Sequence, residues 1–160
     1  YEIVPGVPAY AAMAAAMKQE LTIPEVAQSI VLTRTSMKST GMPEKETIEN
    51  FAKTGTTLAI HLSIRNMRTL ERQLMPYYDA DCPVVVGYRL TWAGQLLIRG
   101  NLSNIRQKVR EAKITRTALI MIGPALDRDL LFKDSALYDS TKPHVLRPVK
   151  GVELEEPNNT

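Results

Sequence analysis

The sequence predicts an α/β fold: a three-layer α/β/α domain around a mixed, mostly parallel five-stranded sheet, preceded by a remnant of another α/β domain. After residue 28, short apolar segments alternate with amphipathic ones in the order β-α-β-α-β-β-α-β, the pattern of an α/β sheet. Several apolar segments are continuous, as in parallel strands buried on both faces. Residues 1–23 offer one short strand and one helix, so we interpret them as the end of the preceding domain.

Residue composition and the positions of Pro and Gly predict the first elements. Residues 2–4 resemble the tail of a strand stopped by Pro5 and Gly6, and the alanine- and methionine-rich residues 8–18 favour a helix. Residues 29–34 (SIVLTR) are β-branched and apolar, which is typical of a buried strand.

A loop, a helix and a second strand are expected next. The polar residues 37–41 (MKSTG) indicate a loop, and Pro43 followed by acidic residues suits the first turn of a helix. Ile48 and Phe51 fall on one face of that helix. Residues 57–62 (TLAIHL) then read as a buried strand.

The following residues predict a helix, a hairpin and another helix. Residues 67–76 carry an apolar helical face, and residues 84–90 (VVVGYRL) form a strand with a continuous apolar start. Ala-Gly at 93–94 indicates a hairpin into a strand at 95–99 (QLLIR), and residues 102–109 form an amphipathic helix.

The last clear strand is residues 117–122 (TALIMI). The periodicity fades after residue 126 into a polar tail. We therefore expect the end of a first domain and an inter-domain helix at residues 1–23, a second α/β/α domain at 24–126 and a C-terminal tail at 127–160.

The composition is that of one globular domain. The chain has 160 residues, of which 44% are hydrophobic and 23% charged, which excludes disordered, collagen-like and coiled-coil chains. A net charge of +3 is too small for a dedicated nucleic-acid binder, so no nucleic-acid partner is expected. No apolar run approaches the ~20 residues of a membrane span, and a reducing cytoplasm fits the single cysteine. The first residue is Tyr1 instead of Met, which fits a processed chain or part of a longer protein.

The sequence lacks the familiar motifs of metal binding and nucleophilic catalysis. His61 and His144 are far apart and have no cysteine nearby, so no protein-bound metal is expected. Cys82 is interpreted as a small buried hydrophobic residue. No glycine-rich phosphate loop or serine elbow is present. His61 lies inside a predicted strand and is either packed locally or faces a ligand.

Arginines lie at or just beyond several predicted strand ends. They are Arg34, Arg65, Arg89 and Arg116. Ligands of open α/β sheets bind in the crevice past the carboxyl ends of the strands, and a guanidinium group suits a carboxylate there. The alternative is that these arginines pair with neighbouring Glu or Asp side chains.

Six segments carry a more specific signal: VPGVPAYAA (4–12), LTIPEVAQSIVLTR (21–34), GTTLAIHLS (55–63), DCPVVVGYRLTW (81–92), IRGNLSNIRQKV (98–109) and ITRTALIMIGPAL (114–126). In this order and spacing they closely resemble the tetrapyrrole methylases. The similarity covers nearly all of residues 1–126 and continues more weakly over 137–148.

The resemblance implies two α/β/α domains with S-adenosylmethionine bound in the cleft between them. It implies that this chain holds the last strand and helix of the first domain and all of the second, without the donor-binding loops of the first domain. The implied activity is methyl transfer to C11 of precorrin-4 or cobalt-precorrin-4 in cobalamin biosynthesis, releasing S-adenosylhomocysteine, with the chain inactive alone. A tetrapyrrole substrate, a homodimer and a cytoplasmic location are implied as well.

Two other functions stay open at this point. One is another tetrapyrrole methylase, acting on uroporphyrinogen-III or a different precorrin. The other is a truncated, non-catalytic module that binds a tetrapyrrole or dimerises, which the missing donor loops favour.

The resemblance also implies site residues. Those implied to contact the methyl donor are Pro8, Ala9, Leu62, Tyr88, Leu90, Thr117 and Ala118. Family members generally have a small residue where Leu90 stands and a small hydroxyl residue where Pro8 stands. Those expected to face the substrate are Arg89 above all, with Arg34, Arg65, Arg116 and His61. No catalytic base is assigned, and His61 is the neutral-pH titrating group near the expected cleft.

Overall fold

The structure is a computed structural model that describes residues 1–36 and 40–129. Residues 37–39 of the predicted loop 37–41 lie outside the described residues, as does most of the predicted tail 127–160, including His144. The described residues belong to one compact unit.

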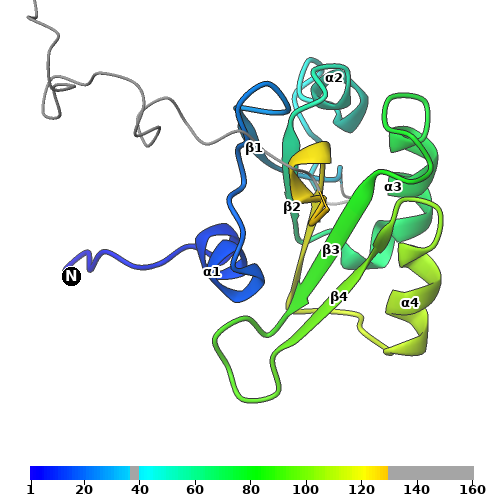
Figure 1. The fold of residues 1–160 in the computed structure, drawn as a ribbon. Helices are drawn as coiled ribbons and strands as arrows, with labels where there is room; N and C mark the ends of the chain where they lie inside the picture. Colours follow the sequence, from blue (N-terminus) through cyan, green and yellow to red (C-terminus); the bar gives the residue numbers. More distant parts are fainter. Residues whose placement is uncertain (37–39, 130–160) are drawn as a thin grey trace, which may run out of the picture. The chain divides into compact units, whose positions relative to one another are not determined.

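The elements follow the predicted order along the chain (Figure 1). The helices are α1 (Ala9–Met17), α2 (Ile48–Ala52), α3 (Met67–Leu74) and α4 (Ile105–Glu111), with 3-10 turns η1 (Ile64–Asn66) and η2 (Pro124–Leu126). The strands are β1 (Ile30–Arg34), β2 (Thr57–His61), β3 (Pro83–Tyr88), β4 (Leu96–Asn101) and β5 (Ala118–Ile122).

One predicted strand is absent, and one predicted helix begins later than expected. Residues 2–4 belong to no strand, because no strand of the sheet pairs with them. The helix expected from Pro43 begins at Ile48, because Thr47 caps it: the Thr47 Oγ1 accepts a hydrogen bond from the backbone N–H of Asn50 at 3.1 Å.

The sheet is mixed, with the strand order β1-β2-β5-β3-β4. Strands β1 and β2 are parallel, whereas the pairs β2–β5, β5–β3 and β3–β4 are antiparallel. The expected mixed five-stranded sheet is confirmed, but the expectation that it is mostly parallel is wrong. The β3–β4 hairpin reverses the chain direction, and β5 then enters between β2 and β3, antiparallel to both. The continuous apolar run of β3 therefore reports burial on both faces, which any central strand has.

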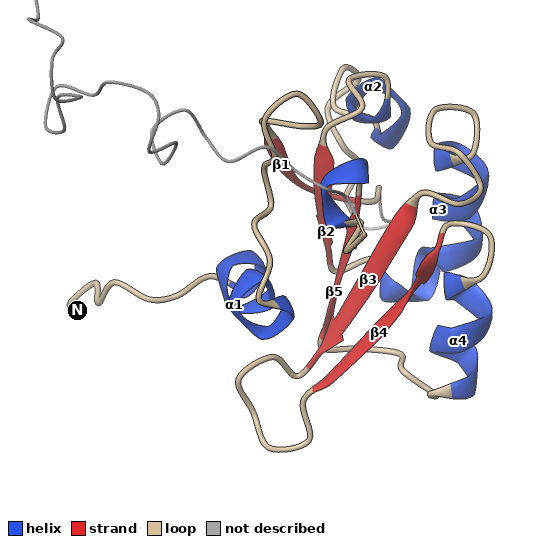
Figure 2. Cartoon of the chain, in the orientation of Figure 1, coloured by secondary structure: helices blue, strands red, loops and turns tan. Residues whose placement is uncertain are grey.

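Helices cover both faces of the sheet (Figure 2). Side chains alternate between the faces along each strand. Helices α2, α3 and α4 pack on one face against Leu58, Ile60, Val84, Val86, Ile120 and Ile122. On the opposite face, Met13 and Met17 of α1 pack against Ala59, Val85 and Met121. The assignment of residues 1–23 to a preceding domain stays a prediction.

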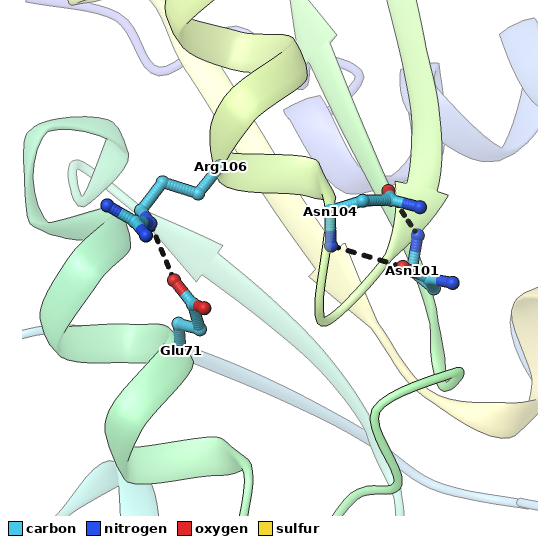
Figure 3. A network of polar contacts seen from close by, with 4 residues as sticks. All are labelled: Glu71, Asn101, Asn104 and Arg106. Atoms are coloured by element: carbon cyan, nitrogen blue, oxygen red, sulfur yellow. Dashed lines mark hydrogen bonds and ion pairs between the residues drawn. The ribbon is translucent and has the colours of Figure 1, made fainter.

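Polar contacts connect α3 to α4 and shape the turn between β4 and α4 (Figure 3). The Arg106 Nε lies 2.6 Å from the Glu71 Oε2, which ties α4 to α3. At the end of β4, the backbone N–H groups of Asn101 and Asn104 each donate to the other residue's side-chain oxygen at 3.1 Å. This reciprocal pair sets the turn from β4 into α4.

Candidate functional site

All five strands have one end at the same edge of the sheet. Strands β1, β2 and β3 finish at this edge, and β4 and β5 begin there. The register pairs that place them are Arg34–His61, Tyr88–Leu96 and Tyr88–Ala118. Thr117, the first residue of the strand predicted at 117–122, lies just before the amino end of β5. It still reaches this edge, because β5 runs antiparallel to its neighbours.

A cleft of about 940 Å³, which we call the strand-end cleft, opens at this edge. Most of the residues expected from the sequence line it, namely Ala9, Arg34, His61, Leu62, Arg65, Arg89, Leu90, Arg116, Thr117 and Ala118. Pro8 and Tyr88 are not among its lining residues. The Tyr88 side chain packs against the hydrophobic core, and the Arg89 guanidinium lies 5.4 Å from the centre of its ring. The structure thus brings the expected residues together, while their roles toward a ligand stay predictions.

The cleft opens where β5 is still paired with β3 but no longer with β2. The β2–β5 ladder ends at the pair Ile60–Ile120, whereas the β3–β5 ladder continues to Ala118. The side of Ala118 that faces β2 therefore has no ladder partner. Directly after β2, Leu62 has a φ of 54° and is 79% exposed.

Backbone strain gathers around this opening. Leu62, Arg89, Thr91 and Thr117 all have positive φ and all line the cleft. The left-handed conformation costs a residue with a Cβ roughly 1–2 kcal/mol. Such strain persists where the surrounding structure imposes it, which is common at binding and catalytic sites. One such restraint is the hydrogen bond from the Arg89 N–H to the Thr117 carbonyl at 3.0 Å.

A chain of hydrogen bonds behind the cleft holds the ends of β1 and β2. The Ser63 hydroxyl donates to the His61 carbonyl at 2.6 Å. Its oxygen accepts from the Thr35 N–H at 2.8 Å and lies 2.9 Å from the Thr35 Oγ1. Because the Ser63 proton is already used, Thr35 must donate in that second contact, and its own oxygen accepts from the Asn66 side-chain amide at 2.6 Å. Ser63 and Thr35 are both buried, so the chain fixes the two strand ends to each other.

Among the described residues, the arginines of the cleft bond to backbone carbonyls or have no acidic partner. The Arg34 guanidinium donates to the carbonyls of Thr35, Thr40 and Gly41 at 3.2–3.3 Å. The Arg65 Nε donates to the Thr115 carbonyl at 3.1 Å. Within residues 1–36 and 40–129, no ion pair involves these two arginines, Arg89 or Arg116, and no Asp or Glu lines the cleft. The alternative of pairing with neighbouring acids is thus not seen in this part of the chain.

Leu90 fits into the cleft wall because Gly87 leaves room for it. A Cβ placed on Gly87 would lie 2.8 Å from the Leu90 Cδ2. The Leu90 side chain packs partly with the core cluster on the α1 side of the sheet. The large residue at this position is therefore accommodated against β3.

Several cleft residues were not expected from the sequence. They are Val7, Ala12, Thr40, Ile64, Asn66, Gly87, Thr91, Trp92, Thr115 and Leu119. Trp92 carried a usable signal, because it is the single tryptophan of the chain and stands in a predicted hairpin turn. The others carry no residue-type signal, and only the folded chain brings them to the cleft.

Chemistry away from the cleft is limited in the described part of the chain. No group of His, Cys, Asp and Glu side chains there is arranged to hold a metal ion. Cys82 is buried, as expected, and burial raises the pKa of its thiol to about 12, which disfavours the nucleophilic thiolate. Among the helices of residues 1–36 and 40–129, none has the length and apolarity to cross a membrane.

Two curated relatives share much of this sequence. A Sinorhizobium sp. protein named precorrin-4 C(11)-methyltransferase is 48% identical over 87% of this chain and 54% of its own length. A Pseudomonas aeruginosa protein of the same name is 45% identical over 92% of this chain and 58% of its own length. The chain therefore spans somewhat more than half the length of these relatives.

Solved structures share the fold. The X-ray structure of a cobalamin biosynthetic enzyme, cobalt precorrin-4 methyltransferase CbiF, matches 79% of this chain and 53% of its own chain, with a TM-score of 0.75 and 35% identity. A Thermus thermophilus uroporphyrin-III C-methyltransferase structure complexed with S-adenosylhomocysteine covers 78% of this chain and 53% of its own, with a TM-score of 0.60 and 20% identity, which supports the fold alone.

Residues 1–106, about two thirds of the chain, match the family described as Tetrapyrrole (Corrin/Porphyrin) Methylases. The match covers α1, the strands β1 to β4 and much of the lining of the strand-end cleft. The chain belongs to the tetrapyrrole methylase family.

Proposed function

We propose that the chain is the C-terminal portion of an S-adenosylmethionine-dependent methyltransferase that methylates C11 of precorrin-4 or cobalt-precorrin-4 in cobalamin biosynthesis. The observation that carries the proposal is the strand-end cleft, which unites residues of the same segments that resemble the family. The names and identities of the relatives support the reaction and its position. Because the chain spans about half their length, we propose that it needs the preceding domain for activity.

The cleft lining fits one half of an adenosyl pocket. Leu62, Leu90 and Ala118 supply apolar surface, and the β2-facing side of Ala118 has no ladder partner. Apolar walls with a few backbone polar groups are typical of sites that hold an adenine without formal charge. We propose donor contacts at Ala9, Leu62, Leu90, Thr117 and Ala118, with Pro8 and Tyr88 supporting the same surface from outside the lining.

The positive charge of the cleft suits a substrate with several carboxylates. Arg89 and Arg116 are exposed and have no acidic partner in the described residues, so their guanidinium groups are available. Arg34 and Arg65 already donate hydrogen bonds to backbone carbonyls, and we propose that they bind the outer carboxylates of the substrate. Guanidinium–carboxylate pairs are among the stronger hydrogen-bonded contacts of proteins, so this rim would orient the macrocycle.

The catalytic contribution of these residues is alignment. S-adenosylmethionine, when bound, supplies an electrophilic methyl group to a nucleophilic ring carbon. Holding two reactants at near-attack distance accounts for a large share of such rate enhancements. The hydrogen-bond chain through Ser63 fixes the tip of β2, and with it Leu62 and His61, against the donor side of the cleft. His61 also lines the cleft, and we leave the base for the displaced proton unassigned.

We also propose the arrangement of the whole protein. Residues 1–23 would complete the first domain, 24–126 form the second and 127–160 a tail, and the protein would be a cytoplasmic homodimer. Light scattering on the complete protein tests the dimer, and a monomeric mass at working concentration would refute it.

Calorimetry with S-adenosylhomocysteine tests the donor pocket, on the protein that contains these residues together with the preceding domain. We expect Leu62→Asp to weaken binding at least tenfold, because it places a charge on an apolar contact surface. Leu32→Asp is the matched control, since Leu32 is also an exposed leucine at 52% but lies outside the cleft lining. Unchanged binding in Leu62→Asp would show that the donor pocket lies elsewhere.

A substrate-side test uses arginine variants. Arg89→Ala is expected to weaken tetrapyrrole binding while leaving S-adenosylhomocysteine binding unchanged. Arg72→Ala, an exposed arginine of α3 that does not line the cleft, is the control. Equal tetrapyrrole affinity in both variants would refute the role of Arg89.

Another methylation position is the second candidate. A Bacillus subtilis uroporphyrinogen-III C-methyltransferase is 33% identical over 77% of this chain. Mass spectrometry and NMR of the product formed from each candidate substrate separate the two reactions. Methyl transfer by the 160-residue chain alone would exclude a non-catalytic module.

A further inference from the structure

Trp92 is an unburied aromatic residue in the cleft wall. It is the single tryptophan of the chain, lies between β3 and β4 and leaves 62% of its surface exposed. It belongs to none of the hydrophobic clusters formed by the described residues. An indole contributes most to stability when it is buried, so its exposure here has no explanation in the packing of this domain.

The loop that carries Trp92 is held by its own hydrogen bonds. The backbone N–H of Trp92 donates to the Arg89 carbonyl, and the backbone N–H of Gln95 donates to the Trp92 carbonyl, each at 3.0 Å. The Thr91 N–H donates to the Gln95 Oε1 at 2.7 Å, and Gly94 adopts a φ of 80° that closes the turn. Because this backbone is already ordered, little conformational entropy would be lost when a ligand contacts the indole.

The charges nearby identify the kind of ligand. Arg89 and Arg116 line the same cleft as Trp92, and no acidic side chain of the described residues does. A flat apolar face beside guanidinium groups suits a planar ring with carboxylates at its rim. S-adenosylmethionine has a net positive charge, because its sulfonium and ammonium groups outweigh its single carboxylate, so this side of the cleft favours a polycarboxylate over it.

We propose that Trp92 is a stacking surface for the tetrapyrrole ring, with Arg89 and Arg116 receiving its carboxylates. This rests on the proposed function and adds to it a specific residue that positions the substrate. Leu62 and Ala118 would then hold the donor, while the β3–β4 loop holds the acceptor.

The single tryptophan makes the test direct, because all indole emission of the 160-residue chain comes from Trp92. The probe is uroporphyrin III, a planar tetrapyrrole polycarboxylate whose own absorption band reports binding independently. We expect uroporphyrin to quench the emission. We expect Trp92→Ala to weaken uroporphyrin binding at least fivefold, and Trp92→Phe to retain most of it. The matched control is Tyr77→Ala, an exposed aromatic residue outside the cleft lining, which should bind as the wild type does.

The outcomes separate the inference from the proposed function. If the uroporphyrin band shifts equally in wild type and Trp92→Ala, the stacking role is wrong while tetrapyrrole binding stands. If S-adenosylhomocysteine, and not uroporphyrin, binds more weakly to Trp92→Ala, the indole belongs to the donor half and the inference is overturned. If Trp92→Ala changes only the sedimentation of the chain, the indole is a contact between copies. Absence of any band shift in the wild-type protein that also contains the preceding domain would count against the proposed function as well.

Discussion

Replacing Ser63 by alanine removes the oxygen at the centre of the hydrogen-bond chain behind the cleft. Ser63 is 1% exposed, so water cannot take the place of the lost oxygen. The Thr35 N–H then has no acceptor, while the Thr35 hydroxyl can rotate to another partner and the His61 carbonyl, on a half-buried residue, can be hydrated. One buried, unpaired N–H costs about 1–3 kcal/mol, and we expect the free energy of unfolding to fall by about 2 kcal/mol.

Urea unfolding of the 160-residue chain, followed by circular dichroism, measures this loss. The urea midpoint should fall while the denaturant slope stays constant, because the surface exposed on unfolding does not change. Ser103→Ala is the control: its hydroxyl also bonds to a side-chain oxygen, that of Asn101 at 2.9 Å, but in an exposed setting. If Ser63→Ala is no less stable than Ser103→Ala, the hydrogen-bond chain does not hold the strand tips.

Three further predictions concern the frame around the cleft. Gly123→Ala should lower the free energy of unfolding by more than about 2 kcal/mol in urea titration. The reason is that Gly123 has a φ of 153° and that a Cβ there would lie 2.9 Å from the Thr57 Cα. A smaller loss would show that β2 can shift to make room for the methyl group. Burial raises the pKa of Cys82 to about 12, so the folded chain keeps a proton that the unfolded chain releases as pH rises above about 9. The stability supplied by this group is therefore complete below that pH and declines toward pH 12. Cys82→Ala should reduce the loss of unfolding free energy between about pH 9 and pH 12, measured by unfolding curves. An identical loss in both proteins would contradict the raised pKa of Cys82. Arg106→Ala should cost less than about 1 kcal/mol, and less still in high salt, because its bond to Glu71 is partly exposed; a large, salt-independent loss in the same assay would refute this.

Local sequence features predicted the elements well but not their pairing. The apolar runs at β2, β3 and β5 identify buried strands because each buries side chains on both faces. Nothing in residues 118–122 states which strands they will join, since the same run would suit a parallel or an antiparallel neighbour. The start of α2 was misplaced for a local reason: Pro43 and Thr47 are both acceptable starts, and the hydrogen bond from the Asn50 N–H decides for Thr47.

The candidate site was predictable to the extent that it consists of strand ends. Arg34 ends one recognisable strand, and Leu62 and Arg89 follow two others, so a shared edge brings them together. The residues that sequence reasoning missed reach the cleft by other routes. Thr115 does so through a loop without periodicity, and Trp92 through a hairpin whose tip could have pointed to either face.

The position of β5 in the sheet has a consequence for synthesis on the ribosome. Strand β5, the last strand among the residues that the structure describes, is the middle strand of the sheet and is flanked by β2 and β3. Until residues 118–122 leave the exit tunnel, the nascent chain holds two separate ribbons, β1–β2 and β3–β4, each with a bare edge that can pair with other polypeptides. Completion of the sheet is therefore a late event, and the inner edges of β2 and β3 stay open to wrong partners until β5 fills the gap between them.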